Sequence, residues 1–387
     1  MCAKPELTDS ETSQLQTAAS SFKDWDTLIE KAQNHRLTPL LFKHINGLPD
    51  QAVPPETVNR IKRLFTLNTS RNALLTDKLL DIADVFKTLN IPVFFVKGPL
   101  LAFEAYGNEN LRQYDDLDML VPPGDLMGAV EMLTARGYSP LLTLTAAEKK
   151  AYLVSCRDWV LMDRETGILI DIAPCMGPRY FRVKTHESLF SNTRTVQMAG
   201  VNLPTISPEN TLLFLLTHSC YHSWSRLSWL SDIIAFAEHG PPIDWHRFLA
   251  NSASVRCTRM ALSGLCLAER LLDTRLPQPV HEEIRRDPRA RELAKHVEDR
   301  IRKGRRPVRN ETERWRLNIM VREHLPDGII SLLRYLFAPT TGDWKFLPLP
   351  KKLFPLYYVV RPVRIVYQAM KRAIRRQFFS LSKYFRA

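Results

Sequence analysis

Residues 116–121, with the sequence DLDMLV, constrain the fold more than any other part of the chain. Acidic and apolar residues alternate here, and alternate side chains of a β-strand point to opposite faces of a sheet. Asp116 and Asp118 should therefore project together, while Leu117 and Met119 face a core. Two carboxylates held this close repel each other, and a bound Mg²⁺ relieves the repulsion because it prefers carboxylate oxygens. The alternative is a strand start with two solvated acids.

A third acid lies inside the apolar segment ILIDI at residues 168–172. This segment reads as a buried strand, and Asp171 in its middle needs a partner because an unpaired buried charge is costly. If the strand lies beside residues 116–121, three carboxylates converge. Three carboxylates suit two Mg²⁺ ions that hold the attacking and leaving oxygens of a phosphoryl transfer, with Mn²⁺ as the alternative ion.

Two residues upstream have the chemistry of a phosphate site. Residues 91–96 (IPVFFV) predict a strand, and a short helix should follow over 100–106. Gly98 between them allows a phosphate to approach the helix start, and Lys97 can neutralise a triphosphate. Arg112 either holds a phosphate or pairs with a carboxylate. The alternative for Lys97 is a surface lysine in an ordinary turn.

Helical patterns dominate on both sides of this α/β segment. Residues 22–89 have helical spacing with a Pro-Pro break at 54–55, and apolar helices are expected from residue 208 onward. Two further strands, 159–162 and 168–172, flank a hairpin-like turn. The expected domains are an N-terminal helical arm (1–90), an α/β core (91–205), a helical domain (206–345) and a basic aromatic tail (346–387).

His218 and His222 are four residues apart and should share one helix face. No third ligand or neighbouring glutamate completes a zinc site. Asp232 shares that face only if one helix runs through residues 223–228. These three residues either pack the helical domain against the core or line a pocket for an acceptor.

The chain has 387 residues, 45% of them hydrophobic, which is enough for a sizeable core and about two or three domains. Its 54 Lys and Arg against 41 Asp and Glu give a net charge of +13, which favours nucleotides, nucleic acid or acidic lipid as partners. The six cysteines form no CxxC pair, and no signal stretch or run of ~18 apolar residues is present. We expect free thiols and a cytoplasmic location, including the periphery of the inner membrane surface.

Ten Lys or Arg alternate with aromatic residues between positions 351 and 386, and no acid follows Asp343. Such a segment can lie on an anionic membrane surface or bind RNA phosphates. The alternative is a helix with one apolar face, including Tyr357, Val360, Val363 and Tyr367, packed on the helical domain.

Residues 91–121 resemble the signature of an uncharacterised bacterial nucleotidyltransferase family in the polymerase-β-like superfamily. The residues that fit are Lys97, Gly98, Tyr106, Gly107, Arg112, Asp116 and Asp118. A second block, HSCYHSWSRLSWLSDI, is similar to a family motif through His218, His222, Trp224, Leu227, Trp229 and Asp232. The resemblance extends over most of the chain, because two further segments are more weakly similar to the family: WDTLIEKAQNHRLTPLL and DWKFLPLPKKLFPLYYVVRPVRI.

Two positions and one spacing depart from the pattern. Pro99 stands where the superfamily commonly has serine or a second glycine, the spacing from Gly98 to Asp116 is longer than usual, and Ala173 replaces a frequent histidine.

The resemblance implies a small polymerase-β-like nucleotidyltransferase sheet with an N-terminal helical arm and a larger C-terminal helical region. It also implies Mg²⁺-dependent transfer of a nucleoside monophosphate from an NTP such as ATP, with release of pyrophosphate. The acceptor is an unknown small molecule, peptide or protein. In this scheme Asp116 and Asp118 bind the metal, and Asp171 completes the site and helps to deprotonate the acceptor. The alternatives are a non-catalytic or antitoxin-like binding module, and an adaptor at an RNA or membrane surface.

Overall fold

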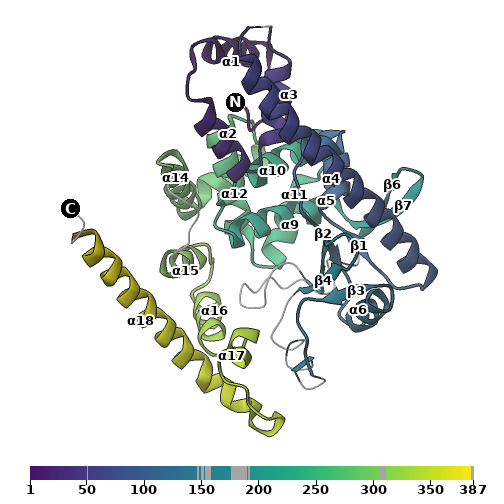
Figure 1. Ribbon diagram of the computed structural model, residues 1–387, viewed down its shortest axis with the longest axis vertical. Coiled ribbons are helices and arrows are strands. Elements are labelled where there is room, and N and C mark those ends of the chain that lie inside the picture. The colour runs from purple at the N-terminus through teal and green to yellow at the C-terminus, as the bar shows by residue number, and fades with distance from the viewer. Residues whose placement is uncertain are drawn as a thin grey trace. The chain divides into compact units, whose positions relative to one another are not determined.

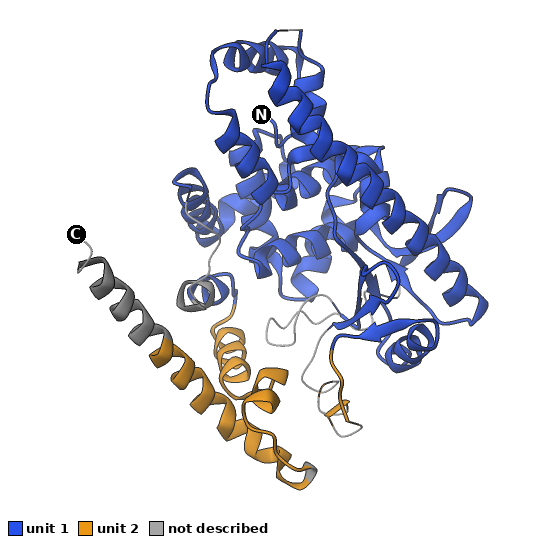
Figure 2. Cartoon of the chain, viewed as in Figure 1, with its two compact units in different colours: residues 1–141, 158–177, 183–323 blue, residues 142–157, 178–182, 324–387 orange. Residues whose placement is uncertain are grey.

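A computed structural model of the chain shows a mixed α/β fold in which helices outnumber strands (Figure 1). The structure describes residues 1–49, 51–145, 148–149, 152, 158–175, 190, 192–304 and 311–384. These residues group into two compact units, coloured separately in Figure 2. The first contains residues 1–141, 158–177 and 183–323, and the second contains 142–157, 178–182 and 324–387. The expected arm, the α/β strands and most of the helical region thus belong to the first unit.

The N-terminal arm is helical, as its spacing predicts. Its helices are α1 (Asp9–Ser21), α2 (Trp25–Asn34), α3 (Thr38–Asn46) and α4 (Pro55–Thr88). Helix α1 begins with a capping box in which Thr8 and Glu11 satisfy each other's backbone N–H groups. Near the middle of α4, Asn68 and Asn72 donate hydrogen bonds to the backbone carbonyl of Arg112, at 3.3 and 2.8 Å. The arm therefore holds the segment that leads into the DLDMLV strand.

The main sheet has five strands in the order β1-β2-β5-β4-β3. They are β1 (Phe94–Phe95), β2 (Asp116–Leu120), β3 (Tyr138–Pro140), β4 (Trp159–Asp163) and β5 (Leu169–Ala173). Only β2 and β5 pair in parallel, and every other pair is antiparallel. Leu117, Met119, Ile170 and Ile172 are buried on one face of the central pair, so the acids between them take the other face.

A separate hairpin consists of β6 (Thr193–Met198) and β7 (Val201–Ile206). Its two-residue turn, Ala199 and Gly200, has positive φ at both positions, which matches the twist of the strands. Thr205 donates a buried hydrogen bond of 2.6 Å to the carbonyl of Phe95, so the hairpin is tied to the edge strand β1.

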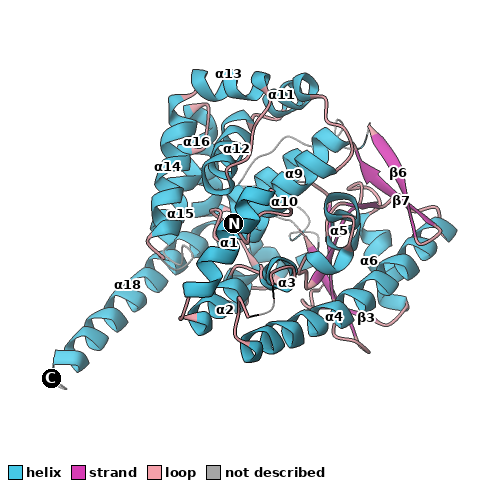
Figure 3. Cartoon of the chain, turned by 90° about the horizontal axis from the view of Figure 1, so that it is seen from above, coloured by secondary structure: helices cyan, strands magenta, loops and turns pink. Residues whose placement is uncertain are grey.

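Helices complete the first unit. They are α5 (Gly98–Tyr106), η1 (Glu109–Leu111), α6 (Leu126–Ala135), α9 (Pro208–Tyr221), α10 (Leu227–His239), α11 (Trp245–Ser254), α12 (Thr258–Leu272), α13 (Gln278–Arg286), α14 (Pro288–Arg302) and α15 (Glu311–Met320). Helix α5 packs against α10, on the side where the strands meet the helical region (Figure 3). Ser223 and Trp224 take positive φ values of 57° and 47°, which ends α9 and separates it from α10.

The second unit contains α16 (Leu325–Phe337), α17 (Thr341–Phe346), η3 (Lys351–Leu356) and α18 (Tyr357–Tyr384). A fully buried acid, Asp343, lies at its centre and forms ion pairs with Arg361 and Arg364 of α18. Among the described residues, no helix is both long enough and apolar enough to cross a membrane.

The predicted fold class is confirmed, but several elements differ from expectation. The strand expected over 91–96 is only two residues long, and α1, β3 and the β6–β7 hairpin were not predicted. Pro92 lacks an N–H donor, which shortens the edge strand at that end. No disulfide joins the five cysteines that the structure describes, whereas Cys156 lies outside the described residues.

Candidate functional site

The parallel pairing of β2 with β5 places Asp118 directly opposite Asp171. Asp116 precedes Asp118 by two residues and so lies on the same face of the sheet. The strand adjacency on which the three-carboxylate hypothesis depends is therefore present. Coordination of a metal by these side chains stays a prediction.

Two of these carboxylates, those of Asp118 and Asp171, lie in an environment that opposes their ionisation. Burial raises the pKa of Asp118; Lys97 opposes this shift and Asp116 adds to it. For Asp171, burial raises the pKa well above its ordinary value, and the charges of Asp158 and Asp118 raise it further. In addition, Oδ1 of Asp171 is buried without a hydrogen-bond partner.

Asp158 is an acid of this cluster that the sequence analysis missed. Val160 of β4 lies opposite Asp171, so Asp158, two residues earlier, belongs to the same sheet face. Its charge is the largest charge effect on the pKa of Asp171. The available signal was weak, namely an acid directly before a strand that pairs with the ILIDI segment.

The donor set fits Mg²⁺. All candidate ligands are carboxylate oxygens, and one of them, Oδ1 of Asp171, is buried and unpaired. In the part of the chain that the structure describes, the side chains as they stand form no ready cluster of three or more metal-binding groups. Mg²⁺ usually takes one or two carboxylates and completes its shell with water and substrate phosphates. The facing pair of Asp118 and Asp171 meets that lower requirement.

Lys97 is the counterion of this acidic face. Its Nζ lies 2.8 Å from Oδ1 of Asp118, 3.4 Å from Nδ1 of His218 and 5.5 Å from the centre of the Phe214 ring. The side chain is only 8% exposed, so the alternative of a solvated surface lysine is wrong. The physical reason is that a lysine just after β1 reaches the carboxylates of the neighbouring strand β2.

Gly98 takes a left-handed backbone conformation, with φ of +59°. A Cβ at this position would lie 3.6 Å from the carbonyl oxygen of Asp116, an ordinary contact. The glycine is therefore required by the turn of the backbone from β1 into α5 rather than by lack of space. Its predicted contact with a phosphate stays a prediction.

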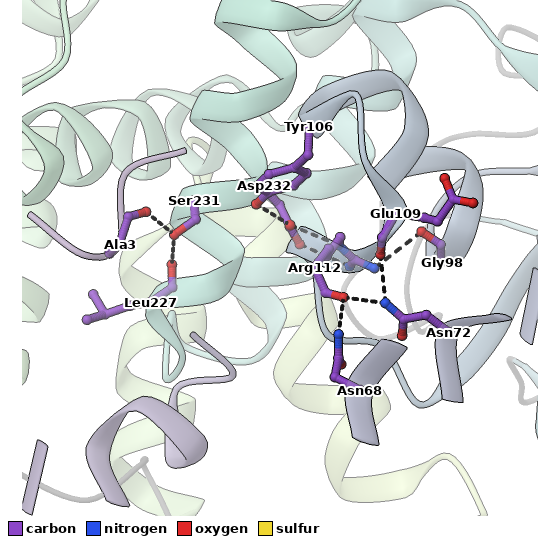
Figure 4. A network of polar contacts seen from close by, with 10 residues as sticks. All are labelled: Ala3, Asn68, Asn72, Gly98, Tyr106, Glu109, Arg112, Leu227, Ser231 and Asp232. Atoms are coloured by element: carbon purple, nitrogen blue, oxygen red, sulfur yellow. Dashed lines mark hydrogen bonds and ion pairs between the residues drawn. The ribbon is translucent and has the colours of Figure 1, made fainter. Parts of the chain in front are cut away.

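Arg112 is held by a carboxylate of the helical region (Figure 4). Its Nε and Nη2 donate to the two carboxylate oxygens of Asp232 at 2.9 and 3.0 Å, and the Tyr106 hydroxyl donates to Oδ1 at 2.9 Å. The side chains of Arg112 and Asp232 are 10% and 3% exposed. Burial by itself lowers the pKa of Arg112, but Asp232, with Tyr106 and Asp118, raises it by more, so the pKa lies above its ordinary value and the guanidinium stays charged. Of the two predicted roles of Arg112, the structure shows the ion pair, and the phosphate contact stays a prediction.

His218 and His222 face each other at a ring distance of 4.7 Å, next to Trp229. Burial lowers the pKa of His218 well below its ordinary value, and the charge of Lys97 lowers it further, so the imidazole is neutral. Asp232 lies on α10, beyond the break at residues 223–224, and contacts Arg112 and Tyr106. The role of these three residues in an acceptor pocket stays a prediction.

The parallel strand pair with facing carboxylates, preceded by a glycine turn into a helix, is the arrangement expected of a nucleotidyltransferase. Residues 21–273 match the model of a family described as uncharacterised nucleotidyltransferase. The chain belongs to this family.

Two solved structures are similar to parts of the chain. One is the solution structure of the antibiotic-resistance factor ANT(2'')-Ia, at 16% identity over 50% of this chain and 96% of that one, with a TM-score of 0.33. The other is the crystal structure of an antigenic nucleotidyltransferase-like protein from Paracoccidioides brasiliensis, at 16% identity over 51% of this chain and 90% of that one, with a TM-score of 0.28. No curated protein matches the chain.

Proposed function

We propose that the chain is a Mg²⁺-dependent nucleotidyltransferase that moves a nucleoside monophosphate from an NTP to an acceptor hydroxyl. The observation that carries the proposal is the parallel register of β2 and β5, which sets Asp118 opposite Asp171 with Asp116 on the same face. Membership of a nucleotidyltransferase family supports the same reaction class.

Asp116 and Asp118 would hold the metal, and Asp171 would complete the site. When bound, Mg²⁺ would neutralise charge on the triphosphate and on the reacting oxygens. Lys97 would exchange its ion pair with Asp118 for one with the triphosphate, because it lies at the turn from β1 into α5, directly beside the acidic face. Gly98 would keep the backbone at that turn open to a phosphate.

Asp171 is the proposed base. The acceptor oxygen forms a bond to the α-phosphorus, the bond from that phosphorus to the bridging oxygen of the leaving pyrophosphate breaks, and the acceptor proton moves to a carboxylate oxygen of Asp171 that the metal does not use. In the metal-free site, burial and the charges of Asp158 and Asp118 raise the pKa of Asp171, which favours uptake of a proton.

Thermal melting with each NTP, with and without Mg²⁺, tests the proposal without knowledge of the acceptor. We expect one or more NTPs to raise the melting temperature only when Mg²⁺ is present, and Asp118→Asn to remove that shift. Asp115→Asn is the matched control, because Asp115 adjoins the site in sequence but pairs with Arg36 and Arg71. A shift of wild-type size in Asp118→Asn would contradict the metal role. With an active NTP identified, labelled nucleotide and candidate acceptors then test transfer itself.

The ion pair between Lys97 and Asp118 favours one second candidate, a non-catalytic binding module. In such a protein, the lysine would permanently replace the metal at the acidic face. NTP binding that needs no Mg²⁺ and survives Asp118→Asn would support this candidate against the first.

A further inference from the structure

Helix α18 of the second unit turns a polar face inward. Arg361 and Arg364 are 9% and 12% exposed in their side chains and pair with the fully buried carboxylate of Asp343. Arg361 also donates to the Tyr335 carbonyl and to the Thr340 hydroxyl, at 3.1 and 2.9 Å. These contacts fix which side of the helix faces the unit.

The opposite side of α18 is apolar and open to solvent. Val359, Val363, Val366 and Met370 recur at helical spacing and are 63%, 58%, 57% and 59% exposed. A helix on the surface of a globular protein ordinarily has the reverse arrangement, with apolar residues inside and charged residues outside.

Helix α16 of the same unit repeats this inversion. Its polar or small residues Asp327, Gly328 and Ser331 are buried, whereas Leu325 and Ile329 are 77% and 50% exposed. Leu332, Leu333 and Phe337 are also exposed. These two helices of the small unit thus leave several large apolar side chains exposed, and such exposed apolar groups commonly mark an interaction site.

The charge of this region favours an anionic partner. No acidic residue follows Asp343, and ten Lys or Arg lie between residues 351 and 386, two of which, Arg361 and Arg364, are already paired with Asp343. Lys352 and Lys371 are exposed, and Nζ of Lys371 lies 5.9 Å from the centre of the exposed Tyr367 ring. Apolar stripes with aromatic residues and unopposed cations match the boundary between anionic headgroups and acyl chains. RNA would pair with the cations but leave the aliphatic stripe in water.

We propose that the second unit docks on an anionic lipid surface through the exposed apolar residues of α16 and α18. Val359, Val363, Val366 and Met370 enter the acyl boundary, and the exposed Lys352 and Lys371 contact the lipid headgroups. The inference does not depend on nucleotidyl transfer, so it stands or fails separately from the proposed reaction.

Co-sedimentation of the full chain with vesicles tests this inference. Vesicles of phosphatidylcholine with phosphatidylserine are compared with vesicles of phosphatidylcholine alone, at low and at high salt. We expect clear preference for the anionic vesicles, with partial binding retained at high salt because apolar burial is not screened. The double variant Val363→Asp with Val366→Asp should bind the anionic vesicles at least about tenfold more weakly, since it removes two apolar side chains and adds two negative charges. Lys371→Gln should lower binding about fivefold, which corresponds to about 1 kcal/mol.

Leu67→Asp is the matched control, because Leu67 is a leucine of α4 in the first unit that is 68% exposed. This variant also puts an aspartate in place of an exposed apolar residue, but outside the second unit, and it should bind the vesicles as the wild type does. Circular dichroism on all variants checks that the helices remain. Wild-type binding by the double variant overturns the proposal. So does binding of RNA without binding of vesicles, or a full-length dimer that the double variant converts to a monomer, since this face would then serve another partner.

Discussion

Replacing Asp232 with alanine should destabilise the first unit strongly. The carboxylate accepts two hydrogen bonds from Arg112 and one from Tyr106, all between 2.9 and 3.0 Å. It is 3% exposed, so water does not replace these bonds when the side chain is removed.

The magnitude follows from what remains after the substitution. Arg112, 10% exposed, would keep a long contact of 3.5 Å to the carbonyl oxygen of Gly98 and the face of the Tyr114 ring at 5.6 Å, and neither supplies a negative charge. Removal of one partner from a buried ion pair typically costs about 3–5 kcal/mol, because the other charge is left uncompensated. We expect Asp232→Ala to lower the free energy of unfolding by this amount. The double variant Arg112→Met with Asp232→Leu should recover most of the loss, because it removes both charges.

Urea unfolding at neutral pH, followed by tryptophan fluorescence and by circular dichroism, measures the effect. Coincident transitions justify a two-state free energy. Glu238→Ala is the control on the same helix, since Glu238 is 41% exposed and its loss should change stability by less than about 0.5 kcal/mol. A loss below about 1 kcal/mol in Asp232→Ala, or a double variant less stable than both single variants, would refute the argument.

Three further outcomes are expected. Gly98→Ala should lower the free energy of unfolding by about 1–2 kcal/mol, because alanine disfavours the φ of +59°, and chemical unfolding measures it. Asp171→Asn should stabilise the metal-free protein by about 0.5–2 kcal/mol and so raise its melting temperature, because it removes a buried carboxylate whose pKa is raised by burial, Asp158 and Asp118. An unchanged or lower melting temperature would contradict this. Lys78→Met should cost about 2 kcal/mol at pH 7, because Lys78 lies 2.9 Å from Asp163, which is 7% exposed. Burial raises the pKa of Asp163, but the ion pair with Lys78 and the hydrogen bond from the Glu165 N–H lower it by more, so the folded pKa is below the unfolded one. The contribution of the pair is thus complete above about pH 4 and is lost as the pH falls through the folded pKa, so the wild type and Lys78→Met should converge in acid; a constant difference would refute it.

Local patterns predicted the strands that carry the acids. The alternation in DLDMLV and the apolar frame of ILIDI each indicate a strand, and β2 and β5 begin within one residue of the expected positions. Their parallel pairing could not be derived from either segment, because it depends on the path of the chain between them. For the same reason Asp158 was missed, since its place beside Asp171 depends on the register between β4 and β5.

Two local signals were overlooked because other features masked them. The segment that forms α1 looks unstructured by composition, yet Thr8 and Glu11 form the capping box that begins a helix. The hairpin of β6 and β7 has Ala199 and Gly200 at its turn instead of the more common Asn-Gly.

The tail shows how a distant residue can reverse a local prediction. One of the alternatives had Tyr357, Val360, Val363 and Tyr367 packed inward; of these, Tyr357 is buried and Val360 is half-buried. Val363 and Tyr367 are 58% and 49% exposed. The cause is Asp343, whose buried carboxylate pairs with Arg361 and Arg364 and so turns the polar side of α18 toward the unit.

The two sequence blocks that carry the family resemblance meet in space through three contacts. Lys97 of the first block reaches His218 of the second, while Arg112 and Tyr106 of the first both bind Asp232 of the second. None of the second-block residues lies on the strands that carry the acids. A neutral His218 can accept a hydrogen bond from Lys97 without competing for the negative charge of Asp118, and Asp232 anchors the segment that leads from α5 into β2. The helical region therefore contributes to the acidic site indirectly, by fixing the position of its one buried lysine and the start of its central strand.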